Sequence, residues 1–169
     1  MKIGTYKINR MISQIIVLIT VVLSTVNCQN TTETPVNDKS GPAKVENVTV
    51  SGSDGSYSFS VTLKSPDTGC DQYANWWEVT SADGNTLYYR RILAHSHVSE
   101  QPFTRSGGTV AIDADTEIII RAHMHPSGYG EGNIAMKGSI INGFTAYDVT
   151  DGFGKDLEKI DPQPNGCTF

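Results

Sequence analysis

From residue 45 onward the chain consists of short segments in which apolar and polar residues alternate. The clearest is Tyr57-Ser58-Phe59-Ser60-Val61-Thr62-Leu63, where every odd-numbered position is apolar. Successive side chains of a strand point to opposite faces, so this pattern predicts a strand with one buried face. By the same criteria we predict further strands at residues 45–50, 73–80, 86–97, 109–112, 116–125 and 133–141.

Turn-forming residues separate these segments. Ser81-Ala82-Asp83-Gly84-Asn85 lies between two of the predicted strands and predicts a β-hairpin. No segment before the C-terminal tail shows a sustained helical period. Many short strands with such turns predict an all-β fold, an antiparallel immunoglobulin- or fibronectin III-like β-sandwich, with a small cupin-like β-barrel as the alternative. Residues 117–123 and the glycine-rich stretch 126–132 resemble the last hairpin of such a sandwich.

Two adjacent tryptophans, Trp76 and Trp77, fall within one predicted strand. Neighbouring side chains of a strand face opposite sides. We therefore expect one tryptophan in the sandwich core, and the other partly exposed or covered by a loop.

The N-terminus has the organisation of an export signal. Lys2, Lys7 and Arg10 precede an apolar run, residues 15–26, that is too short for a stable membrane span. Residues 1–27 are therefore predicted to be a signal peptide. The run ends at Cys28 and resembles a bacterial lipoprotein signal, although Asn27 stands where a small residue is usual. This resemblance implies lipidation of Cys28 and anchoring at a membrane surface in the cell envelope, either periplasmic or on the outer surface.

The rest of the 169 residues predicts one tethered domain. Residues 28–44 are polar and contain two prolines but no aromatic residue, which predicts a flexible tether. Residues 45–169 form the single predicted sandwich domain. Removal of the signal peptide leaves ten Lys and Arg against eighteen Asp and Glu, a net charge of −8. Such a charge disfavours nucleic acid as a partner, because nucleic-acid binding depends on basic contacts to phosphate.

Two cysteines, Cys70 and Cys167, remain once Cys28 is assigned to the leader. In an exported protein they most simply form a disulfide bond. Closing a loop of this length contributes roughly 4 kcal/mol in the chain-entropy model. The alternative is that the two thiolates join the histidines as metal ligands.

All four histidines lie in two His-x-His pairs, His95/His97 and His123/His125. In a strand both members of each pair would point the same way. If the two strands are neighbours, four imidazoles converge on one point, which predicts a metal site for a zinc or copper ion. Scattered surface histidines and a pH-sensitive cluster are the alternatives.

The second ring nitrogen of each ligand histidine needs a hydrogen-bond acceptor. Glu100 and Gln101 are candidates for this supporting role. Four protein ligands usually close a zinc site, which favours metal capture or buffering over catalysis. If one histidine stays off the metal, a water-bearing three-histidine site becomes possible, and an enzyme with it.

The core Arg90-Arg91-Ile92-Leu93-x-His95-Ser96-His97-x-x-Glu100-Gln101-Pro102-Phe103-x-Arg105-Ser106-Gly107-Gly108 is similar to that of a family of small exported bacterial proteins and lipoproteins. The resemblance implies a role in metal homeostasis and assigns no catalytic residue. A cupin site is also similar, but its glutamate follows the second histidine after three or four residues, and Glu100 follows after only two. Cu,Zn superoxide dismutase provides an architectural analogy, because it builds a four-histidine copper site on a β-sandwich.

We therefore expect an exported, lipid-anchored protein that captures or buffers zinc or copper. The alternatives are a metal-dependent enzyme, cupin-like or redox, and a fibronectin-type interaction module whose histidines are incidental. Two glycosylation sequons, Asn30-Thr31-Thr32 and Asn47-Val48-Thr49, are short enough to occur by chance, and the bacterial-type leader gives them little weight.

Overall fold

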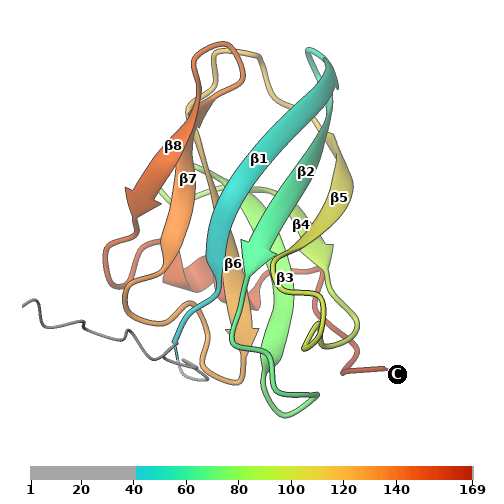
Figure 1. The fold of residues 1–169 in the computed structure, drawn as a ribbon. Coiled ribbons are helices and arrows are strands. Elements are labelled where there is room, and N and C mark those ends of the chain that lie inside the picture. The colour runs from blue at the N-terminus through green and yellow to red at the C-terminus, as the bar shows by residue number, and fades with distance from the viewer. Residues whose placement is uncertain (1–40, 169) are drawn as a thin grey trace, which may run out of the picture. The chain divides into compact units, whose positions relative to one another are not determined.

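A computed structural model describes residues 41–168 of the chain (Figure 1). The predicted signal peptide, the predicted lipidation site Cys28 and most of the predicted tether lie outside the described residues. The described part contains eight strands and one short 3-10 helix: β1 (Lys44–Ser53), β2 (Ser56–Lys64), β3 (Tyr73–Ser81), β4 (Leu87–Ile92), β5 (Phe103–Val110), β6 (Ile118–His125), β7 (Ile134–Ser139), β8 (Gly143–Asp148) and η1 (Lys155–Lys159). No helix within residues 41–168 is long and apolar enough to cross a bilayer.

The strands form two antiparallel sheets that face each other (Figure 1). One sheet has the order β1-β2-β5, and the other has the order β4-β3-β6-β7-β8. These neighbours match strands A-B-E and C-F-G of an immunoglobulin-type sandwich, with β4 in the C′ position and β8 added beyond G. The sheets do not close into a barrel. The predicted β-sandwich is therefore confirmed, and the cupin-like alternative is wrong.

The apolar core lies between the two sheets. The alternation predicted for β2 is present, since Tyr57, Phe59, Val61 and Leu63 are buried there. They belong to one core cluster with Trp77, Val79, Ile118, Ile120, Ala122 and Met124 of the other sheet. Each large side chain removed from water in this way contributes about 1.5–3 kcal/mol.

Three strands differ from the prediction. β4 ends at Ile92 and does not continue to His97, because the chain leaves the sheet after the bond from the Leu93 N–H to the Asn75 carbonyl. β5 begins at Phe103, well before the predicted start at residue 109. β8 was not predicted at all, and most of its side chains are exposed, so it lacks an apolar pattern.

The C-terminal segment is fixed to the domain by a disulfide bond. Cys70 and Cys167 are bonded, with a Cα–Cα distance of 5.5 Å and a sequence separation of 97. The predicted disulfide is confirmed, and the alternative of two thiolate metal ligands is wrong. This bond ties the tail to the loop that precedes β3.

Candidate functional site

The first histidine pair lies in the loop between β4 and β5. His95 is exposed, whereas His97 is only 2% exposed. The His97 ring stacks on Phe103 with a centroid distance of 3.8 Å and an interplanar angle of 5°. The His95 ring lies next to it, with a centroid distance of 4.5 Å. The loop thus brings two imidazoles together, although neither belongs to a strand.

A buried carboxylate, that of Asp67, holds this loop in place. It accepts hydrogen bonds from the backbone N–H of His97 at 2.8 Å and from the backbone N–H of Ala74 at 2.9 Å. Gln101 donates to the carbonyl of His97 at 3.1 Å and accepts from the backbone N–H of Ser65 at 2.9 Å. Gln101 therefore positions the backbone and does not hold an imidazole nitrogen.

Neither ring nitrogen of His97 has a hydrogen-bond partner within the described residues. Asp67 Oδ2 lies 3.8 Å from Nδ1, beyond hydrogen-bonding distance. Burial lowers the pKa of His97, and the Arg105 charge adds to this effect. Glu100, the other predicted supporting residue, forms an ion pair with Arg105 at 2.7 Å, and this hydrogen bond lowers its pKa. His97 is therefore a neutral, buried imidazole with unused nitrogen atoms.

The second pair lies at the end of β6. His123 stacks on Trp76 with a centroid distance of 3.6 Å. Its Nδ1 lies 2.7 Å from Asn75 Oδ1, and its Nε2 lies 3.2 Å from Glu158 Oε1. Burial lowers the pKa of His123 to about 4, against the opposing effect of the Glu158 carboxylate. His123 is thus neutral near pH 7, and its single N–H donates to one of these two oxygens.

His125 is the last residue of β6, and it is exposed. The centroid of its ring lies 5.7 Å from the centroid of the Tyr73 ring. Met124 points the other way, into the core. The alternation expected around the second histidine pair is therefore present.

The structure does not gather the four imidazoles. Among residues 41–168 no three His, Cys, Asp or Glu side chains form a group that could hold a metal ion. The convergence predicted from two neighbouring strands fails because the first pair lies beyond the end of β4. Metal binding by either pair remains a prediction.

Next to His123, the outer face of the larger sheet carries a buried ionic network that the sequence analysis missed. Glu78 of β3 pairs with Arg90 of β4 at 2.7 Å and with Arg121 of β6 at 2.8 Å. All three side chains are fully buried. The Tyr129 hydroxyl also donates to Glu78, at 2.6 Å. The signal in the sequence was a single charged residue in each of β3 and β6, Glu78 and Arg121, whereas β4 carries two adjacent arginines.

The two guanidinium groups also bind the C-terminal segment. Arg90 donates to the carbonyls of Leu157, Ile160 and Pro162. Arg121 donates in the same way to the carbonyls of Phe153 and Gly154. The backbone of the tail thus satisfies donors that would otherwise be buried without partners.

Aromatic rings complete this polar layer. Arg90 lies over the Trp76 ring, 4.4 Å from its centroid, and Arg121 lies over the Tyr129 ring at 3.6 Å. Such cation–π contacts are strongest where the charge is removed from water. Burial raises the pKa of Tyr129, so its hydroxyl remains a hydrogen-bond donor to Glu78.

A cavity of about 380 Å³ lies beside this network. It is formed by two glycine-rich segments, residues 126–133 and 149–158. Asn133 lines it, is only 1% exposed, and has an Oδ1 with no hydrogen-bond partner in the described part of the chain. The cavity can hold a small polar molecule or water, because its walls combine charged groups with backbone.

The described part of the chain is thus an immunoglobulin-type β-sandwich. It carries the His95/His97 pair in the β4–β5 loop and a buried ionic network on the outer face of its larger sheet. No family model and no solved structure matches the chain. One curated protein, named "Putative lipoprotein" and from Halomicrobium mukohataei, is 42% identical over 89 residues. The similarity covers 52% of this chain and 43% of the relative, so the chain spans less than half the length of the protein it matches.

Replacing Glu78 with Gln should strongly destabilise the domain. Two buried guanidinium groups would lose their shared counter-ion, and breaking a buried pair in this way costs about 3–5 kcal/mol. Urea unfolding followed by tryptophan fluorescence measures the loss. As a control, Glu117→Gln removes an exposed ion pair with Lys137 and should cost less than about 1 kcal/mol. Equal effects of the two substitutions would contradict the central role of Glu78.

The depressed pKa of His123 should make stability depend on pH. Between its usual value of 6.5 and about 4 the unfolded chain binds a proton at this position that the folded chain does not. The stabilising contribution is therefore complete above pH 6.5 and is lost as the pH falls towards 4. Comparing urea midpoints of the native protein and His123→Phe across this range isolates the effect, since His97 is present in both. Parallel pH profiles would contradict the assignment.

Proposed function

We propose that this chain is an exported β-sandwich protein, held at a membrane surface by a lipid on Cys28. Three observations support export and anchoring. The leader has a basic start and an apolar run that ends in a cysteine. The Cys70–Cys167 disulfide is typical of an oxidising compartment. The partly matching relative carries the name "Putative lipoprotein".

We further propose that the His95–His97 loop binds zinc or copper. The observation that carries this proposal is the His97 imidazole, which is buried with both nitrogens unpartnered beside the exposed His95 ring. A buried polar atom without a partner costs free energy, and a metal ion would supply the missing partner. Imidazole nitrogens suit zinc and copper.

Two imidazoles from one loop leave coordination positions for water or for another donor. Such a site suits capture and release of the ion better than permanent structural binding, which uses four protein ligands. The His97 nitrogens are buried, so metal binding requires the loop to move and expose them. His123 is a poorer ligand, because both of its nitrogens already face side-chain oxygens.

Calorimetric titration of untagged mature protein with Zn²⁺ and Cu²⁺ tests the metal site. We expect one ion per chain, with an affinity that falls as the pH drops through about 6.5, because protons compete for imidazole. His95→Ala with His97→Ala should abolish this binding. His125→Ala, which removes an exposed histidine of the other pair, should leave it intact. Binding that survives the double substitution would rule out the loop as the site.

Membrane anchoring has a separate test. The Cys28→Ser variant should appear in the soluble fraction after export, whereas the native chain should partition into detergent and carry the mass of a lipid on its N-terminal peptide. The reason is that the acyl chains, and no part of the folded domain, would hold the protein to the bilayer. Retention of Cys28→Ser on washed membranes would contradict the anchor.

A further inference from the structure

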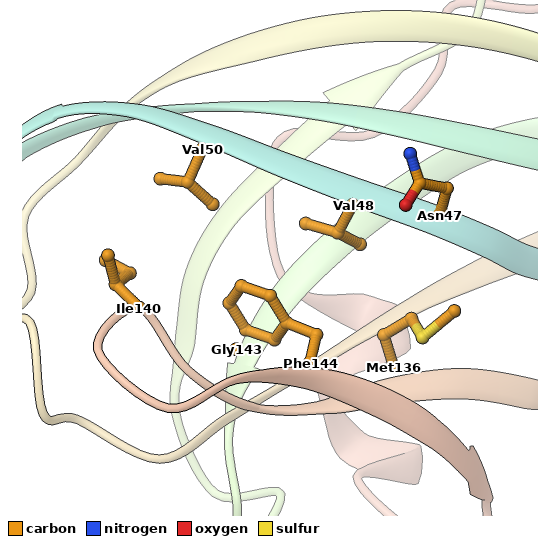
Figure 2. Close-up of a pocket in the computed structure, with 7 residues that line it drawn as sticks. All are labelled: Asn47, Val48, Val50, Met136, Ile140, Gly143 and Phe144. Atoms are coloured by element: carbon orange, nitrogen blue, oxygen red, sulfur yellow. The ribbon is translucent and has the colours of Figure 1, made fainter.

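A groove of about 260 Å³, lined mostly by apolar side chains, opens between β1 and the β7–β8 hairpin (Figure 2). Val48 and Val50 of β1 lie on one side of it, and Met136, Ile140 and Phe144 lie on the other. These five side chains pack against the core but remain partly exposed. Asn47 and Gly143 complete the lining. Partly exposed apolar side chains of both sheets therefore meet at this side of the sandwich.

The strand beside this groove is an edge strand. β1 pairs only with β2, so its other side presents backbone N–H and C=O groups without strand partners in the described part of the chain. A long edge strand next to an apolar surface favours pairing with another chain. Natural sandwiches protect such edges with charges, bulges or covering groups. β1 has a register shift between Val45 and Asn47, but its middle is regular.

One of the two sequons lies at this position. Asn47 and Thr49 are both exposed and, being two residues apart in a strand, lie on the same face, opposite to that of Val48 and Val50. The Asn47 side chain still lines one end of the groove, at the edge of the strand. Within residues 41–168 the Asn47 side chain makes no hydrogen bond or ion pair. Its amide nitrogen points away from Met136 and Phe144 and is therefore accessible at the rim of the groove (Figure 2), which the sequence pattern alone did not indicate.

We propose that Asn47 is an N-glycosylation site and that its glycan covers the apolar groove and blocks the edge of β1. In the modification a bond forms between Asn47 Nδ2 and C1 of a sugar carried on a lipid-linked phosphate donor. The bond from C1 to the phosphate oxygen breaks, the lipid phosphate leaves, and the amide loses one proton to a base of the transferase.

A glycan fits this position for physical reasons. Its hydroxyl groups are solvated, while the C–H faces of its rings can lie over Phe144 and the two valines. A bulky group in the first half of β1 also prevents a second strand from approaching. The proposal rests on the export proposed above, because the sugar donor is met only during or after membrane passage.

Peptide mapping of the protein isolated from the membranes of the cells that make it tests the modification. Trypsin releases residues 45–64 as one peptide, which contains Asn47 and not Asn30. We expect this peptide to carry the mass of a glycan. Thr49→Ser preserves the sequon and should keep the glycan, whereas Thr49→Val preserves the strand and should lose it.

The same digest separates the two proposals. A mature N-terminus at Cys28 with an unmodified 45–64 peptide overturns the glycan and leaves export standing. A chain that retains residues 1–27 overturns export itself. A second copy of the chain seated on an unmodified β1 would likewise overturn the glycan as the covering group.

The shielding role has its own readout. Asn47→Gln, purified from the same cells, should bind a hydrophobic dye more strongly and self-associate in sedimentation experiments. Adding Phe144→Ser to Asn47→Gln should reverse both changes by removing the apolar wall of the groove. Unchanged dye binding and self-association in Asn47→Gln would overturn the shielding role.

Discussion

The structure depends above all on one buried carboxylate shared by two guanidinium groups. Glu78 lies directly opposite Arg90 in one ladder and directly opposite Arg121 in the other, so three neighbouring strands carry one row of charge. Burying two guanidinium groups and one carboxylate carries a large desolvation penalty unless their remaining N–H groups find acceptors. The C-terminal segment offsets this penalty, because its backbone carbonyls accept hydrogen bonds from both arginines. The disulfide at Cys167 then fixes the tail in place.

This polar layer gives the larger sheet two packed faces, an apolar one towards β1-β2-β5 and a charged, aromatic one under the tail. β3 and β6 are buried on both faces as a result. The polar layer also determines which histidines have ring nitrogens free to bind a ligand. His123 lies within the layer, where Trp76, Asn75 and Glu158 occupy its ring and its nitrogens. His97 lies outside the layer, in a loop where Asp67 bonds its backbone and leaves its ring free.

Two of the four edge strands, β4 and β1, differ in what lies beside them. At β4 the C-terminal segment binds the sheet through Arg90, whereas at β1 the hydrogen-bonded ladder ends beside a groove lined mostly by apolar side chains. An exported protein that is concentrated on a membrane surface meets many copies of itself, so an uncovered edge matters more there than in dilute solution. The proposed metal loop and the proposed glycan site both lie outside the ionic layer. That layer stabilises the domain and need not change during binding.

The sequence by itself determined the features that follow from local periodicity. Alternation in residues 57–63, the turn at Asp83-Gly84 and the opposed faces of Trp76 and Trp77 were predicted because strand geometry fixes them residue by residue. The disulfide followed from two leftover cysteines in a chain predicted to be exported. Only the tertiary structure determined the pairing register of the strands and the residues at which they end. Glu78 meets Arg121, 43 residues away, through the pairing of β3 with β6, and no local pattern encodes that alignment. The first histidine pair was misplaced for the same reason, since alternation does not indicate that β4 ends at Ile92.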